Sequence, residues 1–247
     1  MDMDRLAGFL SDWISAKVRE AGAAGAVVGV SGGIDSAVVL ALCRRALGDN
    51  VLGLILPCHS LAEDIDHAEL VLRHFRARGK TIRLDRVYDD LVAAGGEAAV
   101  PGDSRAAGLA RANVKPRLRM TALYYHANML NYLVAGTGNR SEIAVGYFTK
   151  YGDGGVDILP IGGLVKEQVR ALAAHLGVPR VVIDKPPTAG LWPGQTDEGE
   201  MGITYRDIDD YLLTGKGDRD VIRRIGEMHA RSEHKRRPAP VAALPLD

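Results

Sequence analysis

Short apolar segments alternate with amphipathic segments along the chain, and this alternation restricts the fold more than any other feature of the sequence. Strands are predicted for the apolar runs 26–30, 51–57, 81–84 and 132–136. Helices are predicted between and around them, over 4–21, 35–47, 63–78, 86–92 and 112–129. Strands that alternate with helices form parallel sheets. We therefore expect an α/β fold, with a doubly wound parallel sheet and helices on both faces.

The second half of the chain predicts a strong helix and two irregular segments. Residues 163–179 place five apolar side chains on one helical face and end at Gly177 and Pro179. Shorter helices are expected over 204–213 and 218–231. The segments 94–110 and 185–202 are rich in glycine or proline and are predicted to be loops. We expect 94–110 and 188–203 to be mobile without ligand and to become ordered over bound substrates.

Composition indicates one globular domain, which we take to span 1–247. The chain is 47% hydrophobic and 25% charged, as in ordinary soluble proteins. Lys plus Arg and Asp plus Glu both number 31, and this balance argues against binding to bulk nucleic acid or to anionic membranes. The two cysteines, Cys43 and Cys58, suggest a reducing compartment. Neither a signal peptide nor a membrane-length apolar run is recognisable, so we expect a cytoplasmic protein.

The segment "VGVSGGIDSAVVLALC" (28–43) joins the first predicted strand to the helix that follows it. A glycine turn at the start of a helix presents free backbone N–H groups, which commonly bind phosphate. The segment lacks the Gly-Lys-Ser/Thr ending of a Walker A loop and the third glycine of a dinucleotide fingerprint. Read by itself, it is also compatible with a tight turn in which a serine caps the helix.

"SGGIDS" (31–36) after a buried strand resembles the pyrophosphate loop of the N-type ATP pyrophosphatases. These enzymes cleave ATP between the α and β phosphates and adenylate a substrate oxygen. The resemblance implies that the loop binds ATP and that Asp35 is a ligand of Mg²⁺, which takes carboxylate and phosphate oxygens. The implied ATP-binding residues of this loop are Gly29, Val30, Ser31, Gly32, Gly33, Ile34, Asp35 and Ser36.

Further motifs resemble those of the NAD synthetase family, in its short ammonia-dependent form. They follow the pyrophosphate loop in this order: "NVKPRLRM" (113–120), "GTGNRSE" (136–142), "GYFTKYGDGGVDILP" (146–160), "KPPTAGLWPGQTDE" (185–198) and "HKRRP" (234–238). The resemblance implies a ligase of adenine nucleotide α-hydrolase-like, Rossmann-like fold. Such an enzyme adenylates the nicotinate carboxylate of deamido-NAD with ATP, and ammonia then displaces AMP to give NAD. It also implies a homodimer.

The resemblance assigns roles to individual residues. Glu142 would be the second metal carboxylate, paired with Asp35, and these two with Lys166 would form the catalytic group. Thr137, Lys166 and Thr188 would contact ATP. The residues implied for deamido-NAD are Arg117, Lys150, Asp157, His234 and Lys235. Without the resemblance, Lys166 reads as a solvated helix residue and "HKRRP" as a basic tail.

Other interpretations remain at this point. A different amide- or thio-transferring ATP pyrophosphatase would share the loop, although thiolation generally needs paired cysteines. A nucleotide-binding sensor on the same fold would need no second substrate site. The glutamine-using forms of the family carry an extra amidase domain, and the 30 residues before Ser31 read only as a helix and a strand. We therefore expect ammonia as the nitrogen donor. Pro116 departs from the family pattern and predicts either an altered helix entry or a place in the first turn.

Overall fold

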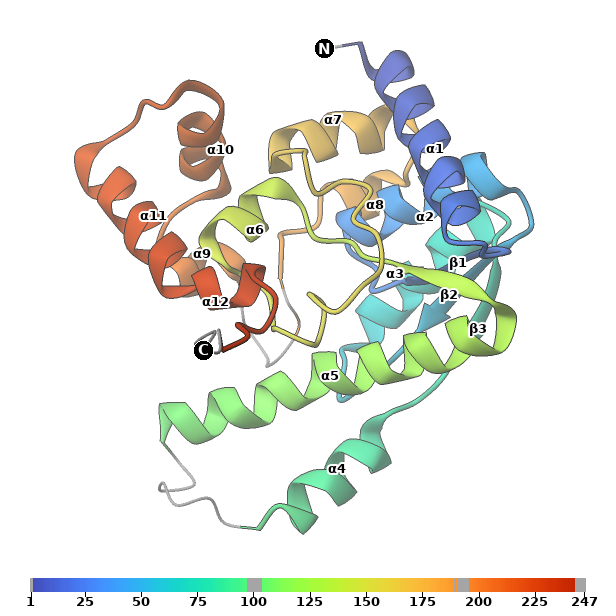
Figure 1. The fold of residues 1–247 in the computed structure, drawn as a ribbon, viewed down its shortest axis with the longest axis horizontal. Coiled ribbons are helices and arrows are strands. Elements are labelled where there is room, and N and C mark those ends of the chain that lie inside the picture. The colour runs from blue at the N-terminus through green and yellow to red at the C-terminus, as the bar shows by residue number, and fades with distance from the viewer. Residues whose placement is uncertain (1, 97–103, 189, 191–195, 243–247) are drawn as a thin grey trace, which may run out of the picture.

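The computed structural model describes residues 2–96, 104–188, 190 and 196–242 (Figure 1). Its described strands form one parallel sheet in the order β3-β2-β1-β4. Their bounds are β1 Gly25–Gly29, β2 Val51–Ile55, β3 Arg78–Thr81 and β4 Tyr132–Ala135. The predicted α/β class with a parallel sheet is confirmed.

Strand β1 lies inside the sheet and pairs on both sides. Val27 is in register with Leu52 of β2 and with Val134 of β4. Side chains of a strand alternate between the two faces, so Val27 enters one apolar cluster, whereas Ala26 and Val28 enter the other. Such a strand is apolar throughout because both of its faces are covered.

One face of the sheet carries the larger core cluster. Helices pack on this face, either directly on the strands or on the helices that cover them. They are α1 Met3–Glu20, α2 Ile34–Leu47, α3 Ala62–His74, α7 Lys166–His175 and α8 Arg180–Ile183. Helix α2 is buried along most of its length, because it lies between the sheet and α1 (Figure 1).

The other face is covered by the long helix α5 (Arg105–Leu130), which packs against β1 and β4. Helix α4 (Asp85–Ala94) adjoins α5 and has no buried residue. Two large side chains of α5, Tyr125 and Met129, are also exposed. With Val87 and Leu91 of α4, they leave apolar side chains exposed on both helices.

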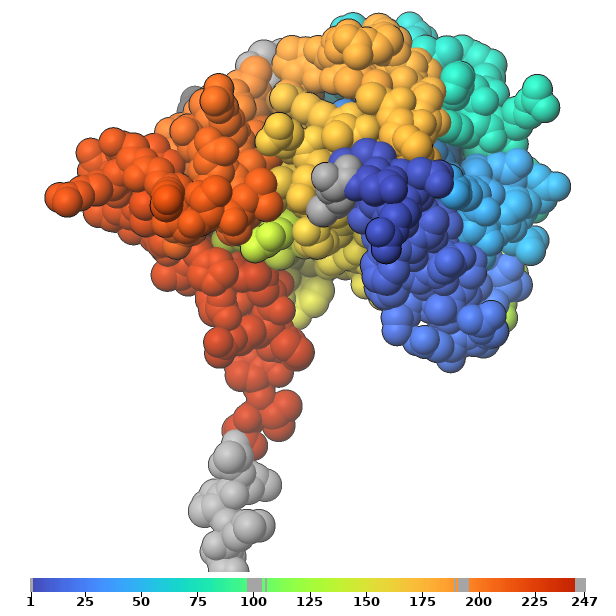
Figure 2. Space-filling model, turned by 90° about the horizontal axis from the view of Figure 1, so that it is seen from above, coloured from blue at the N-terminus to red at the C-terminus, as the bar shows by residue number. Residues whose placement is uncertain are grey.

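The remaining helices form a third group, and all of them except the last, which contacts the helix before it, contribute to a smaller apolar cluster. These are α6 Arg140–Val145, α9 Asp197–Met201, α10 Tyr205–Thr214, α11 Arg219–Arg231 and α12 Glu233–Arg236. Figure 2 shows the C-terminal part of this group, orange to red, on one side of the molecule and α1, dark blue, on another. Helix α10 also contacts α7, so this group is joined to the main core.

Four sequence predictions differ from the structure, and one of them is the loop over 185–202, the end of which forms a short helix at Asp197–Met201. Strand β3 lies at 78–81 rather than 81–84, and all four of its residues are exposed at the sheet edge. The segment 94–110 is not a loop throughout, because α5 already begins at Arg105, where Ser104 caps it. Pro116 consequently lies inside α5 and not at its entry or in its first turn. Residues 97–103, on which the predicted mobility also falls, lie outside the described residues.

Among the residues that the structure describes, no helix is long and apolar enough to cross a membrane. The 26-residue helix α5 reaches the necessary length but carries several charged side chains.

The buried helix α2 yields a stability prediction. Leu42 is fully buried in the main cluster, so Leu42→Ala should lower the free energy of unfolding by about 2–5 kcal/mol. Leu213→Ala, at a site with 49% exposure, should change it by about 0.5 kcal/mol or less. Urea unfolding measures both. Equal effects of the two substitutions would contradict the described core.

Candidate active site

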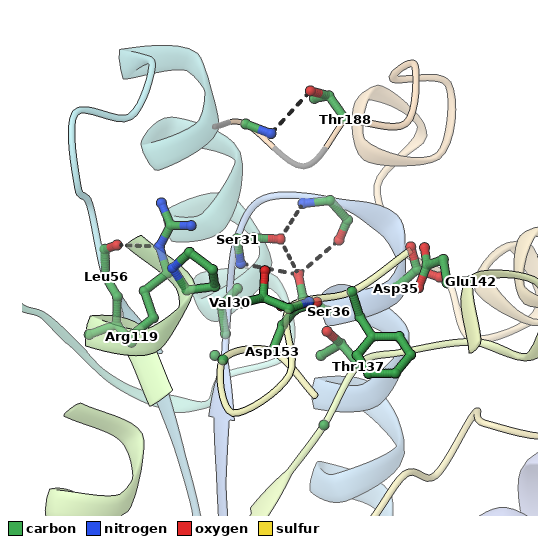
Figure 3. A pocket seen from close by; sticks show the side chains of 18 of the residues that line it. Val30, Ser31, Asp35, Ser36, Leu56, Arg119, Thr137, Glu142, Asp153 and Thr188 are labelled. Carbon is green, nitrogen blue, oxygen red and sulfur yellow. Dashed lines mark hydrogen bonds between the residues drawn. The ribbon is translucent and has the colours of Figure 1, made fainter. Parts of the chain in front are cut away.

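A cavity of about 490 Å³ opens at the carboxyl ends of the strands. Open α/β sheets bind their ligands at this edge, and the volume suits a nucleotide-sized molecule. The predicted site residues that line the cavity are Gly29, Val30, Ser31, Gly33, Ile34, Asp35, Ser36, Thr137, Glu142, Lys166, Thr188 and Lys235. Figure 3 shows several of them converging from different elements.

The loop between β1 and α2 is folded by its own two serines (Figure 3). The N–H of Ser31 donates to Ser36 Oγ at 3.2 Å, and the Ser36 hydroxyl donates to the carbonyl of Gly33 at 2.9 Å. The N–H of Gly33 donates to Ser31 Oγ at 3.3 Å. Gly33 is the N-cap of α2 and supplies no side chain, so N–H groups of the first turn remain available to an anion.

Gly32 faces away from the cavity, toward α3. Its φ of +80° lies in the left-handed region that favours glycine. A Cβ at this position would lie 2.3 Å from the carbonyl oxygen of Asp64. The glycine therefore allows both the turn and the close approach of α3.

A buried charge cluster lies beside the loop. Lys166 Nζ lies 2.5 Å from Asp35 Oδ2 and 3.5 Å from Glu142 Oε1, and its side chain is 3% exposed. Asp35 comes from the first turn of α2, Glu142 from α6 and Lys166 from the start of α7. Figure 3 shows the two carboxylates pointing toward each other.

Asn139, which is fully buried, positions both carboxylates. Its side-chain oxygen caps α6 by accepting from the N–H of Glu142 at 3.0 Å, and its amide nitrogen donates to Asp35 Oδ1 at 3.0 Å. The N–H of Asn139 in turn donates to Glu142 Oε2 at 3.2 Å. The capping box of α6 thus fixes the geometry of the pair.

Burial and neighbouring charges shift the protonation of this cluster. Burial, with the negative charges of Asp35 and Asp197, raises the pKa of Glu142 to about 7, although Lys166 and the Asn139 N–H oppose the shift. Burial alone would lower the pKa of Lys166, but the two carboxylates outweigh it and the net shift is upward. Lys166 is therefore a cation at neutral pH.

The cluster suits a divalent cation. The oxygens of Asp35 and Glu142 converge on the ammonium of Lys166, so the two carboxylates are arranged to hold positive charge. No group of three or more His, Cys, Asp or Glu side chains able to hold a metal is found in the described ranges. Two carboxylates completed by substrate phosphates are the donor set expected for Mg²⁺.

Three residues predicted for a second substrate gather next to the cavity. The Arg117 guanidinium lies 3.5 Å from the carbonyl of Lys150, and the Lys150 ammonium donates to the carbonyl of His234. These residues do not line the cavity, but Thr149 and Lys235, their chain neighbours, do. They therefore form a separate polar group at its margin.

Asp157 and Lys235 are held by backbone groups. Asp157 accepts from the backbone N–H of Val134 at 2.7 Å and also from the side-chain hydroxyl of Tyr124 at 2.9 Å. Lys235 donates to the carbonyls of Gly146 and Phe148, each at 2.8 Å. In this structure both side chains support the backbone around the site.

Sequence reasoning missed Arg119, which lines the cavity instead of Arg117. Its guanidinium donates to the carbonyl of Leu56 at 3.1 Å (Figure 3). It also donates to Ser60 Oγ at 3.2 Å. The helical spacing of residues 112, 116, 119, 120, 123 and 127 places Arg119 on the inward face of α5. That spacing could have identified it.

An ion pair between Asp64 and Lys185 was also missed. Their side chains are 16% and 15% exposed, and both residues line the cavity. Lys185 comes three residues before Thr188, so the pair connects the segment 185–188 to α3. No local sequence pattern joins positions so far apart.

A glycine loop, an open helix N-terminus and paired carboxylates at the edge of a parallel sheet define a nucleotide-binding α/β protein. The family model described as NAD synthase matches residues 7–239. An NH₃-dependent NAD⁺ synthetase from Carboxydothermus hydrogenoformans is 51% identical over 95% of this chain and 96% of its own. The chain belongs to the NAD synthase family.

Solved structures agree with this assignment. The NMN synthetase from Francisella tularensis superposes with a TM-score of 0.92 at 37% identity, covering 99% of this chain and 100% of its own. The NH₃-dependent NAD synthetase from Campylobacter jejuni gives a TM-score of 0.80 at 29% identity, with coverage of 98% and 100%. These two proteins are named for different products, a mononucleotide and a dinucleotide.

The geometry of the loop predicts the effect of Gly32→Ala. The left-handed backbone and the approach of the Asp64 carbonyl should together cost about 1–3 kcal/mol of stability and displace the loop, so that ATP binds more weakly. Unfolding curves and calorimetric titration with ATP measure the two effects. Gly22→Ala is the matched control, because Gly22 has a φ of +64° with nothing near its Cβ position. Unchanged ATP binding by Gly32→Ala would contradict the loop assignment.

Proposed function

We propose that this chain catalyses the ATP-dependent amidation of deamido-NAD by ammonia, giving NAD, AMP and pyrophosphate. The observation that carries the proposal is the union, in one cavity, of the glycine loop with Asp35, Glu142 and Lys166. Relatives of nearly the same length, up to 51% identical, are named NH₃-dependent NAD⁺ synthetases. We propose a single synthetase domain over 1–247 and a cytoplasmic location, where these substrates are soluble.

In the proposed reaction, the β1–α2 loop and Thr137 hold ATP. Asp35 and Glu142 would hold Mg²⁺, and the ion would supply positive charge to neutralise the phosphates. A nicotinate carboxylate oxygen attacks the α-phosphorus, and the bond to the β-phosphate oxygen breaks as pyrophosphate leaves. Lys166 stabilises the charge that develops on the leaving pyrophosphate. Ammonia then attacks the acyl carbon, and AMP departs with the bonding electron pair while the added nitrogen loses a proton.

The segment 185–202 is proposed to cover this site. An acyl-adenylate hydrolyses if water reaches it, so the reaction needs shielding. Lys185, Thr188 and Asp197 line the cavity, and Asp64 holds Lys185 there. Residues 189 and 191–195 lie outside the described residues.

The second substrate is proposed to extend from the cavity toward Arg117, Lys150 and His234, with Lys235 at the boundary. Two cations and an imidazole suit the phosphates of a dinucleotide. Asp157 is retained as a residue of this site through its place beside β4. A homodimer is also proposed, supported by the exposed apolar side chains Tyr125 and Met129 of α5 and Val87 and Leu91 of α4.

A second candidate substrate is nicotinate mononucleotide, because the Francisella tularensis protein of high structural similarity is titled an NMN synthetase. One assay tests both proposals. Purified protein receives ATP, Mg²⁺ and ammonium with either deamido-NAD or nicotinate mononucleotide, and the amide product is measured together with AMP. We expect equal amounts of NAD and AMP, with the higher kcat/KM for deamido-NAD. A higher value for the mononucleotide would replace the first proposal with the second, and no amide from either would reject both.

The carboxylate pair generates a prediction. Asp35→Asn and Glu142→Gln should each lower kcat by about 100-fold or more, as loss of an electrostatic catalytic group does, with the fold retained. Steady-state rates at saturating Mg²⁺ and thermal unfolding measure the two properties. Glu167→Gln, an exposed neighbour of Lys166, is the control and should be near normal. Near-normal rates for both variants of the pair would remove them from the mechanism.

The nitrogen donor generates another prediction. Direct use of glutamine needs a nucleophilic thiolate, yet burial raises the pKa of Cys43 to about 12 and also raises that of Cys58. Free ammonia should therefore support the reaction and glutamine should not. Only the neutral amine has a lone pair for attack, so at fixed total ammonium the rate should rise with pH until the protein unfolds. Comparable rates with glutamine, in the absence of detectable free ammonia, would overturn this prediction.

A further inference from the structure

The hydroxyl of Tyr205 lies between the buried carboxylate of Asp197 and the partly buried carboxylate of Glu142. It is 2.9 Å from Asp197 Oδ2 and 3.2 Å from Glu142 Oε1, and Tyr205 is 2% exposed. A hydroxyl carries one hydrogen, so it donates to one carboxylate at a time. Tyr205 does not itself line the cavity, whereas both of its partners do.

Asp197 connects the start of α9 to the segment 185–188, and both line the cavity. It begins α9, and its N–H donates to the carbonyl of Pro187 at 3.2 Å. Pro187 and Thr188 line the cavity as well. A group bonded to Asp197 is therefore connected to the described wall at 185–188.

The Tyr205 ring is fixed from several directions. It belongs to the third apolar cluster, whose buried members include Val145, Met201 and Ile208. Its N–H donates to Glu198 Oε1 at 2.9 Å. The ammonium of Lys166 lies 4.8 Å from the ring centroid, within the range of a cation–π contact.

These contacts hold Glu142 at one oxygen, and at the other whenever the Tyr205 hydroxyl donates to it. The N–H of Asn139 bonds Oε2, and the Tyr205 hydroxyl lies within bonding distance of Oε1. A carboxylate held in this way cannot rotate freely about its terminal torsion, so its orientation toward Asp35 is set before a cation arrives. Groups that orient metal ligands typically affect metal affinity by about 10–100-fold.

We propose that Tyr205 is a positioning residue, which fixes Glu142 for cation binding and joins it to Asp197 in the wall of the cavity. This inference rests on the proposed role of Asp35 and Glu142 as Mg²⁺ ligands. Tyr205 acts through these carboxylates and touches no substrate. Cation binding and the position of Asp197 are consequently linked through one hydroxyl.

The test compares Tyr205→Phe with Tyr211→Phe. Tyr211 lies on the same helix and packs against the same cluster without lining the cavity, so it provides the same chemical change away from the carboxylates. The Mg²⁺ concentration for half-maximal binding of α,β-methylene-ATP is measured by calorimetry, together with kcat, KM and thermal unfolding. Tyr205→Phe should raise that concentration by about 10-fold and lower kcat, with little change in KM for deamido-NAD. Tyr211→Phe should leave all four quantities near normal.

A loss of thermal stability with an unchanged Mg²⁺ requirement would make Tyr205 merely structural and overturn the proposal. If Tyr205→Phe does not fold, Asp197→Asn provides the second measurement. It keeps the shape but removes the charge that competes with Glu142 for the hydroxyl, so the hydroxyl donates to Glu142 more of the time and the Mg²⁺ requirement should fall. An unchanged requirement in that variant would equally overturn the proposal.

The outcomes separate this inference from the proposed function. Wild-type protein that binds Mg²⁺ and the analogue but makes no amide would reject the function while leaving the binding comparison valid. Wild-type protein that makes NAD, with Tyr205→Phe unchanged in its Mg²⁺ requirement, would reject the inference alone.

Discussion

The site depends on the ammonium of Lys166 lying between the carboxylates of Asp35 and Glu142. One buried and two largely buried charges are costly to remove from water, and the loss of one partner leaves the others uncompensated. Hydrogen bonds offset part of this cost: Asn139 donates to Asp35 and Glu142, and Tyr205 lies within bonding distance of Glu142. Their arrangement requires α2, α6 and α7 to meet within hydrogen-bonding distance, which in turn requires the sheet beneath them.

The same arrangement is suited to chemistry on phosphates. A preformed anion site at the start of α2 lies next to a cation and to two carboxylates that can hold another cation. In such a site the charges are oriented before the substrate enters, so little reorganisation is needed during reaction. The described part of the cavity wall adds Lys185, held by Asp64, and Arg119, held by the carbonyl of Leu56.

Much of the fold followed from the sequence, because buried parallel strands are continuously apolar and their helices are periodic. The errors have physical reasons. The predicted bounds of β3 are three residues too late, because an exposed edge strand has no apolar pattern to mark it. The start of α5 was read as a loop because its alanines and glycine form no apolar stripe, although alanine favours helix. In the site, the loop and its neighbours were anticipated through the family motifs, whereas Arg119, Asp64 and Tyr205 depend on contacts between distant segments that no local pattern records.

The distance along the chain between the charged partners has a consequence for how the protein forms. Asp35 and Lys166 are separated by 131 residues, and β1 lacks its second neighbour until β4 has been synthesised. An emerging chain therefore has the glycine loop long before it has a binding site, and contacts of such large sequence separation are slow to form. Since nucleotide binds only the assembled state, its binding energy stabilises the whole molecule against unfolding rather than one loop. When cellular ATP falls, the enzyme would therefore lose a substrate and also lose part of its stability against unfolding.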